Sequence, residues 1–376
     1  MKFIDLEAQQ NVLISEKLTL RDEINKRIQK VLNEGNFIQG PEVIELESSL
    51  KNFTGSKFCI TTSSGTDALL IALMAIGTKP GDEIITTPFS FISTTETIVL
   101  LGATPKYVDI DPNTYNINPQ KMEERITKKT KAIIPVSLYG QTADFTSINK
   151  VAKKFNLPVI EDGAQSFGAE HKKKKSCNLS TIGTTSFFPS KPLGCYGDGG
   201  ACFTNDKELA DKMRIISLHG QTKRYFHQEI GINGRLDTLQ AAVLLAKLKI
   251  FNQEINLRNK VANRYTNALN QLGFDATPRI SEDNLSVFAQ YTIQVENRES
   301  FQLKLKERNI PTSVHYPTLL YRQPAFNKSS KNELINCENI FKTAERICKK
   351  VVSLPMYPYL TIEDQDKIIE TIKDIL

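Results

Sequence analysis

Between about residues 55 and 205, short runs of apolar and β-branched residues alternate with segments of helical periodicity. The run 58–62 predicts a strand, and the segment 66–76 after it places Leu69 and Leu73 on one helical face. Continuous apolar strands separated by helices are typical of an α/β fold whose mostly parallel sheet is covered on both faces. Ligands of such sheets bind beyond the carboxyl ends of the strands, so polar residues there are the first candidates for a site.

The alternation and the segments around it predict two domains, as expected for a chain of 376 residues. Further strands are predicted at 83–87, 106–109, 132–138, 158–161, 184–188 and 201–204, with a helix at 93–101 and an N-terminal helix at 15–34. One long helix over 236–272 leads to strands at 287–295 and 312–316 and helices at 299–308, 338–350 and 362–375. We therefore expect a large domain over 1–245 and a smaller α+β domain over 246–376.

The composition argues against several classes of protein. No apolar run approaches the roughly 20 residues that span a bilayer, and the first residues lack the apolar core of a signal peptide. Six cysteines without CxxC spacing predict neither a metal site nor a disulfide framework, and they favour the cytoplasm. The net charge is only +6, and the basic run 172–175 is interpreted as a solvated hairpin tip rather than a nucleic-acid site.

Lys191 stands between an aromatic run and a glycine-rich turn, within the segment SFFPSKPLGCYGDGG at 186–200. A lysine is usually a solvated surface cation, but apolar neighbours and a close backbone would remove water from this one. Desolvation lowers the pKa of a lysine amine and makes it nucleophilic near neutral pH. Such an amine is suited to Schiff-base formation with a carbonyl group.

Two further strand ends carry matching chemistry. Asp162 ends an apolar run, and a buried carboxylate there either caps a helix or hydrogen-bonds a protonated pyridine nitrogen. At Ser64-Gly65-Thr66 a strand gives way to a helix, whose free N–H groups bind phosphate if they are not simply part of an ordinary cap. A Schiff-base lysine with an aspartate partner is the signature of pyridoxal 5'-phosphate chemistry, and all three features together predict that cofactor.

The chain resembles the DegT/StrS class of pyridoxal-phosphate-dependent aminotransferases over nearly its whole length. The segments that carry the resemblance are 37–41, 64–69, 161–162, the Lys191 motif, 231–237 and 314–317. The resemblance implies a transferase of fold type I, with a seven-stranded, mostly parallel sheet and helices on both faces. It also implies a homodimer with shared active sites.

The resemblance also implies individual roles. Lys191 is expected to be the catalytic residue, which links to the cofactor and carries protons. The other expected cofactor-binding residues are Gly65, Thr66, Phe91, Asp162, Gln165, Ser186 and Asn233, the last supplied by the partner subunit. Phe91 is expected to cover the cofactor ring, with Phe89 as the second choice. The sugar-binding residues are expected to be Arg235, His315 and Tyr316.

Within the class, segments 136–141, 175–181, 219–221 and 285–292 resemble UDP-2-acetamido-2-deoxy-3-oxo-glucuronate aminotransferases of O-antigen biosynthesis. This resemblance implies transfer of an amino group from L-glutamate to a UDP-linked keto sugar. Two alternatives stay open at this point. One is an aminotransferase for a 4-keto-6-deoxy nucleotide sugar, and the other is a non-catalytic regulatory protein built on the same fold.

Overall fold

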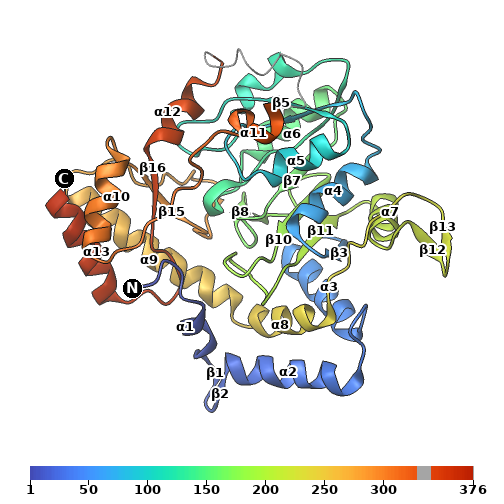
Figure 1. Ribbon diagram of the computed structural model, residues 1–376, viewed down its shortest axis with the longest axis horizontal. Helices are drawn as coiled ribbons and strands as arrows, with labels where there is room; N and C mark the ends of the chain where they lie inside the picture. The colour runs from blue at the N-terminus through green and yellow to red at the C-terminus, as the bar shows by residue number, and fades with distance from the viewer. Residues whose placement is uncertain (328–339, 376) are drawn as a thin grey trace.

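The chain folds around two adjacent β-sheets in the computed structural model, which describes residues 1–327 and 340–375 (Figure 1). The first sheet has the strand order β3 (Phe58–Thr62), β11 (Gly200–Thr204), β10 (Ile182–Ser186) and β7 (Ile160–Asp162). The second has the order β5 (Thr104–Tyr107), β4 (Glu83–Thr86) and β6 (Thr130–Ile133). Neighbouring strands are parallel except around β11, which is antiparallel to both β3 and β10.

These sheets differ from the single seven-stranded sheet that the resemblance implied, because the strands form one mixed four-stranded and one three-stranded sheet. Two isolated parallel bridges, Ile133 with Val159 and Val136 with Asp162, connect β6 and β7. Pro135 lies between the two bridges, and a proline has no N–H with which to continue a ladder. The pairing at this junction is therefore interrupted, although the two strands run side by side.

Helices cover both faces of the four-stranded sheet. Those helices are α3 (Pro41–Thr54) and α8 (Thr238–Leu248) on one face, with α4 (Gly65–Ala75) and α7 (Lys207–Ser217) on the other. Side chains alternate along β11: Ala201 and Phe203 belong to the buried cluster that includes α3 and α8 residues. Cys202 belongs to the cluster that includes α4 and α7 residues. Burial on both faces explains why this strand reads as an uninterrupted apolar run.

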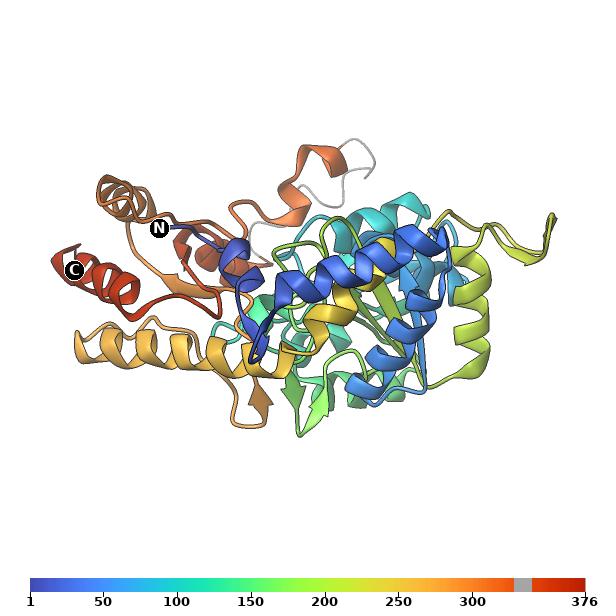
Figure 2. The same cartoon turned by 90° about the horizontal axis from the view of Figure 1, so that it is seen from below.

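The C-terminal part of the chain has a hydrophobic core of its own. The main elements of this core are α9 (Phe251–Gln271), β15 (Tyr291–Gln294), α10 (Arg298–Glu307), β16 (Val351–Leu354) and α13 (Ile362–Ile375). Tyr265, Tyr291 and Leu354 are fully buried in this core. The helix α12 (Lys342–Lys350) instead packs into the buried cluster that includes Phe89 and Tyr107. Figure 2 shows this C-terminal part at one end of the molecule, together with both chain termini. The part that contains the four-stranded and three-stranded sheets lies at the other end.

Two predicted helices have different bounds in the structure. The long helix expected over 236–272 is divided into the two helices α8 and α9. After the break, the Phe251 ring at the start of α9 packs against the rings of Phe53 and Phe167. The N-terminal helix expected over 15–34 is α2 (Leu20–Glu34), which begins late because Thr19 and Asp22 form a reciprocal capping box.

One predicted strand is also corrected. The segment 312–316 is not a strand, and Ser313 forms only an isolated bridge with Ser353. The strand that pairs with β15 is β16, in antiparallel register. The residues expected at 338 and 339 as the start of α12 lie outside the described residues, as does Cys337.

The remaining elements are short or lie outside the two sheets. The helices are α1 (Leu6–Gln10), α5 (Ser93–Leu100), α6 (Phe145–Lys154), α11 (Pro324–Asn327) and the 3-10 turns Pro119–Lys121, Glu123–Arg125, Leu138–Gly140 and Leu320–Arg322. The strands are β1 (Leu13–Ser15), β2 (Leu18–Thr19), β8 (Glu170–His171), β9 (Lys174–Lys175), β12 (Gln221–Lys223), β13 (Phe226–His227) and β14 (Asn284–Leu285). The basic run does form a hairpin, β8–β9. In residues 1–327 and 340–375, no helix has both the length and the apolar character needed to span a membrane.

Candidate active site

A cavity of about 460 Å³ lies where several strands of both sheets end. It collects segments that follow β3, β4, β6, β7 and β10, together with the loop that leads away from α10. Nine of the predicted site residues line it, namely Gly65, Thr66, Phe91, Asp162, Gln165, Ser186, Lys191, His315 and Tyr316. The carboxyl ends of neighbouring parallel strands thus meet at one edge of the sheets, where the sequence predicts a ligand site.

Asp162 supplies a buried carboxylate to the cavity. It ends β7, and its side chain accepts hydrogen bonds from the Thr94 hydroxyl at 2.7 Å and from the Ala164 N–H at 3.3 Å. Burial raises the pKa of Asp162, while these hydrogen bonds and the nearby Lys191 oppose the rise. The carboxylate therefore lacks a full set of protein partners and is able to pair with a cationic ligand group.

Lys191 lies in a tight turn on the same cavity. Its main-chain N–H donates to the Phe188 carbonyl at 2.8 Å. Gly194 is needed to close the turn, because a Cβ there would lie 2.5 Å from the Pro189 carbonyl oxygen. Burial lowers the pKa of the Lys191 amine, and the Asp162 carboxylate partly opposes this. The structure therefore reproduces the desolvated lysine that the sequence predicted, with its aspartate beside it.

The start of α4 forms a narrow cradle against the end of β10. A Cβ at Gly65 would lie 2.6 Å from the Cβ of Ser186, so the backbone of α4 approaches that serine closely. Ser64 caps the helix by accepting a hydrogen bond from the Asp67 N–H at 3.0 Å, which leaves the first N–H groups of the helix without an intrahelical partner. Both predicted roles of Ser64-Gly65-Thr66 are therefore compatible, since the capped helix still presents N–H groups to an anion.

Gln165 joins two tyrosines on another wall of the cavity. Its Oε1 accepts a hydrogen bond from the Tyr139 main-chain N–H at 2.7 Å, and its Nε2 donates to the Tyr316 hydroxyl at 2.9 Å. Burial raises the pKa of Tyr316, with Asp162 adding to the rise, so this phenol stays protonated at neutral pH. Burial also lowers the pKa of the neighbouring His315 to about 4, and Lys191 lowers it further, so its imidazole is neutral.

The two aromatic candidates for covering a ligand ring are separated by the structure. Phe91 lines the cavity, is 53% exposed, and lies with its ring centroid 5.9 Å from that of Tyr316. Phe89 is fully buried and packs edge-on against Tyr139 in the core. Of the two candidates, Phe91 is therefore the one that a ligand in the cavity could contact.

Two predicted residues, Asn233 and Arg235, do not line the cavity. Asn233 is exposed in a loop that forms an isolated bridge with Leu218. Arg235 is partly buried, and its Nε has no hydrogen-bond partner in the part of the chain that the structure describes. Neither residue is among those that surround Lys191.

Thr94 was not identified from the sequence, although its hydroxyl holds the Asp162 carboxylate. A threonine in the first turn of a helix has no distinguishing pattern. Ser93 was missed in the same way, and its hydroxyl lies 2.8 Å from that of Thr66. Only the tertiary packing of α5 against α4 brings these hydroxyls to the site.

Glu161, the neighbour of Asp162, is directed away from the cavity. Its carboxylate accepts hydrogen bonds from the Ser176 hydroxyl at 2.7 Å and the Cys177 N–H at 2.8 Å. Burial raises the pKa of Glu161 from 4.5 to about 7. The native state therefore binds this proton more tightly than the unfolded state does, so the contribution to stability falls as the pH rises through 7.

We expect the Glu161→Gln variant to lose part of this pH dependence, because the amide mimics the protonated acid. Between pH 5 and pH 8, the free energy of unfolding of the native chain should fall by up to about 3 kcal/mol more than that of the variant. Urea denaturation of both proteins at the two pH values measures the difference. Equal pH dependence in the two proteins would contradict the buried, protonated state of Glu161.

Comparisons with known proteins agree with this arrangement. The family model for the DegT/DnrJ/EryC1/StrS aminotransferase family matches residues 18–373. A UDP-2-acetamido-2-deoxy-3-oxo-D-glucuronate aminotransferase from Pseudomonas aeruginosa is 55% identical over 360 residues, which cover 96% of each chain. A DegT DnrJ EryC1 StrS aminotransferase from Brucella abortus superimposes with a TM-score of 0.92 at 40% identity, covering 100% of this chain and 99% of that one. S. venezuelae DesV, solved in complex with a ketimine intermediate, also gives 0.92, at 32% identity and with coverage of 100% and 98%.

Proposed function

The chain belongs to the DegT/DnrJ/EryC1/StrS aminotransferase family, and we propose that it transfers an amino group from L-glutamate to C3 of UDP-2-acetamido-2-deoxy-3-oxo-glucuronate. Membership of this family makes the chain a pyridoxal-phosphate-dependent aminotransferase that acts on a nucleotide sugar. The choice of sugar is carried by one observation, the 55% identity to a Pseudomonas aeruginosa enzyme named for that substrate. The product would serve the biosynthesis of a surface polysaccharide such as O-antigen, in the cytoplasm.

The residues of the cavity fit pyridoxal phosphate. The Gly65–Ser186 cradle has backbone N–H groups and a hydroxyl for a phosphate, and a side chain at position 65 would close it. Asp162 has a carboxylate for the pyridine nitrogen, and Lys191 has an amine for the aldehyde. When bound, the cofactor supplies an electron-accepting ring and the carbon that takes up the amino group.

We assign the proton transfers to the Lys191 amine. Burial lowers the pKa of this amine, which increases its neutral fraction and so favours acceptance of a proton that it can later return. The Asp162 carboxylate would pair with the pyridine nitrogen of the bound cofactor and favour its protonated form. Phe91 covers one side of the site, which orients the ring and limits access of water. Thr94 acts through Asp162, whose carboxylate it holds in position.

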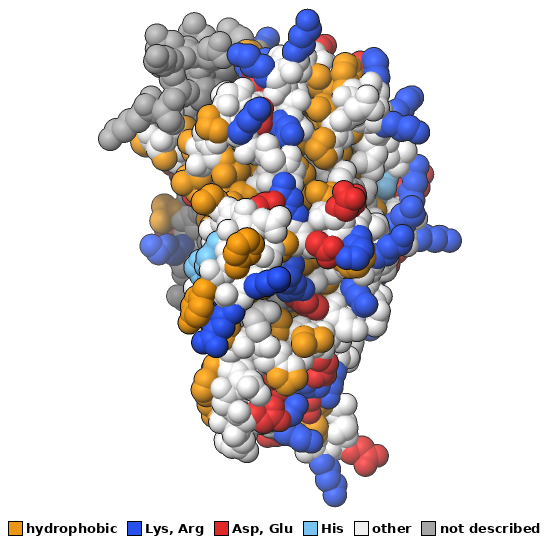
Figure 3. All heavy atoms as spheres, turned by 90° about the vertical axis from the view of Figure 1, so that its right-hand side faces the viewer, with side chains coloured by type: hydrophobic (Ala, Val, Ile, Leu, Met, Phe, Trp, Pro, Cys, Tyr) orange, Lys and Arg blue, Asp and Glu red, His pale blue; other side chains and the backbone are white. Residues whose placement is uncertain are grey.

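We further propose that the active site is completed by a second copy of the chain. The exposed hairpin β12–β13 carries Tyr225, 80% exposed, and Phe226, 61% exposed, and Ile230 just after it is 85% exposed. Figure 3 views the molecule from the side that carries this hairpin, where hydrophobic side chains lie among basic ones. Asn233 and Arg235 follow the hairpin directly, so a partner that covers these apolar residues would also receive those two polar side chains.

Mixed dimers test this sharing of sites. Lys191→Ala chains and Arg235→Ala chains, each nearly inactive alone, should regain about a quarter of the native activity when refolded together in equal amounts. The reason is that half of the dimers would be mixed, and each mixed dimer would contain one site with an intact Lys191 and the partner's intact Arg235. Activity is measured after mixing and compared with the sum of the separate variants. No gain above that sum would mean that Arg235 acts within its own subunit, or not at all.

A direct assay decides the substrate. The holoenzyme is incubated with L-glutamate and either UDP-2-acetamido-2-deoxy-3-oxo-glucuronate or a UDP-4-keto-6-deoxy sugar, and the aminated product is identified by mass. We expect the 3-oxo-glucuronate to react with the higher kcat/KM, because the fork of Arg235 pairs bidentately with a carboxylate. A preference for the 4-keto-6-deoxy sugar would overturn the proposed substrate while leaving the aminotransferase assignment unchanged.

The supporting architecture follows from the same proposal. We infer that residues 1–245 form the cofactor-binding domain and 246–376 the small domain, because the separate C-terminal core draws its buried members from residue 261 onward. We also infer that the two sheets act as one seven-stranded platform, since the bridges between β6 and β7 hold their carboxyl ends together beneath the cavity.

A further inference from the structure

A second cavity lies in the C-terminal part of the molecule, away from Lys191. Its volume is about 670 Å³, within the range of small-molecule sites and larger than the cavity around Lys191. It is bounded by the end of β15, the start of α10 and the loop 274–279, and by the loop that contains Tyr115. None of the residues proposed for the aminotransferase reaction lines it.

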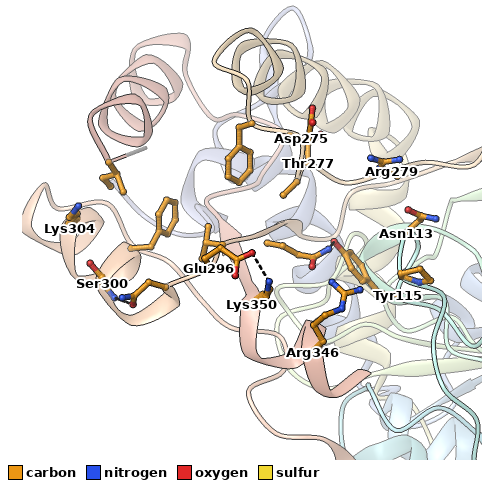
Figure 4. A pocket seen from close by; sticks show the side chains of 18 residues that line it. Asn113, Tyr115, Asp275, Thr277, Arg279, Glu296, Ser300, Lys304, Arg346 and Lys350 are labelled. Atoms are coloured by element: carbon orange, nitrogen blue, oxygen red, sulfur yellow. Dashed lines mark hydrogen bonds and ion pairs between the residues drawn. The ribbon is translucent and has the colours of Figure 1, made fainter. Parts of the chain in front are cut away.

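The charged residues around this cavity are mostly basic. Four basic and two acidic side chains line the cavity. The Lys350 amine forms an ion pair with the Glu296 carboxylate at 2.6 Å. The remaining cations are Arg279, Lys304 and Arg346, for which no ion pair occurs among the described residues. In Figure 4, Tyr115 lies between Arg279 and Arg346 at one side of the cavity, whereas Lys304 and Ser300 lie at the opposite side. The cavity therefore offers excess positive charge with directional N–H donors.

Tyr115 places a buried polar group at the end of the cavity that carries the two arginines. The residue is only 5% exposed, and its hydroxyl oxygen accepts a hydrogen bond from the Gln294 side chain at 3.1 Å. Its own O–H proton has no acceptor among the described residues, so it remains available to a ligand. Burial raises the pKa of this phenol, and Arg346 and Arg279 oppose the rise. Both guanidinium groups line the same cavity as the Tyr115 side chain (Figure 4).

We propose that this second cavity binds a small molecule with a phosphate or carboxylate group, held between Arg279 and Arg346 and hydrogen-bonded by the Tyr115 hydroxyl. The two guanidinium groups are donors only, and the Tyr115 oxygen already accepts from Gln294, which leaves its O–H to donate. An anionic oxygen is an acceptor for all three groups. The start of α10 contributes little, because Asn297 already caps it by accepting a hydrogen bond from the Ser300 N–H. The proposal is independent of the sugar assigned to the enzyme.

Calorimetric titration of the holoenzyme tests the proposal. The probes are inorganic phosphate and, separately, succinate, in a buffer of low ionic strength that contains saturating UDP to occupy the nucleotide site. We expect at least one probe to bind with a Kd in the millimolar range or tighter, and the stronger probe identifies the preferred anionic group. Added salt should weaken this binding, because the two arginines are exposed to solvent.

Variants locate the binding. The double variant Arg279→Gln/Arg346→Gln should bind the same probe at least about tenfold more weakly. Tyr115→Phe removes a single oxygen and should weaken binding about threefold without disturbing the packing. Arg308→Gln is the matched control, since Arg308 is an exposed arginine of the same part of the chain that pairs with Asp374 instead. Failure of both probes to bind the native holoenzyme, unchanged affinity in the double variant, or an equal loss in the control would each overturn the proposal.

Discussion

Replacement of Lys191 by alanine is expected to lower the rate of amino transfer by at least about a thousandfold. The variant would lack both the amine that links to the cofactor and the group that carries protons during the reaction. The long-wavelength absorbance of the lysine-bound cofactor should disappear as well. Single-turnover kinetics and absorbance spectra of the purified variant measure the two effects, and near-native turnover would exclude Lys191 as the catalytic residue.

Lys247 provides a matched control for this experiment. Burial lowers the pKa of Lys247 to about 8, but its amine lies over the Tyr196 ring at 4.5 Å and does not line the cavity around Asp162. The Lys247→Met variant should therefore keep the cofactor absorbance and most of the turnover, provided that circular dichroism shows it to be folded. A comparable loss in both variants would mean that disturbed packing, rather than chemistry at Lys191, explains the result.

The Asp162→Asn variant should lose about tenfold to a thousandfold in turnover. The amide keeps the shape of the carboxylate and its contacts with Thr94 and Ala164, but it removes the negative charge. An opposite charge stabilises a protonated nitrogen by one to three pKa units, and each unit corresponds to about 1.4 kcal/mol. We expect the loss in kcat rather than in the affinity for the sugar, because the charge acts on the cofactor ring.

The neighbouring residue separates this effect from the general cost of changing a buried acid. Glu161→Gln alters an equally buried carboxyl on the same strand, but one that faces Ser176 and Cys177 instead of the cavity. Steady-state kinetics should show nearly native turnover for this variant. If both variants lost turnover alike, Asp162 would have no special role beside the cofactor.

The elements around the site could be predicted where burial leaves a continuous apolar run. The strand expected at 201–204 is β11 (Gly200–Thr204), and the one expected at 58–62 has the predicted bounds. The direction of β11 could not be predicted, since an apolar run looks the same whether its neighbours are parallel or antiparallel. The strand expected at 184–188 is β10 (Ile182–Ser186), which begins two residues earlier. Its start was missed because Gly183 is not typical of a strand. A glycine is needed there, since a Cβ would lie 2.3 Å from the Cys177 carbonyl oxygen.

The site itself was predictable to the extent that its chemistry is local in sequence. Lys191 and Asp162 follow recognisable strands, and their approach to one cavity follows from the parallel sheet. The contacts of Thr94, Tyr139 and Ser93 depend on how α5 and the 138–140 turn pack, which no short pattern encodes. The second cavity is formed by loops and helix ends from distant parts of the chain, so no sequence pattern indicates it.

The hydrogen bond between Tyr139 and Gln165 has a consequence for ligand selection. A main-chain N–H is only a donor, so the amide oxygen of Gln165 must face Tyr139 and its NH₂ group must face the cavity. One amide proton is given to Tyr316, and the other remains for the ligand. This wall therefore favours a ligand tautomer that presents an acceptor oxygen, and it disfavours one that presents only N–H. The polarity of the wall is thus determined by the backbone, before any ligand arrives.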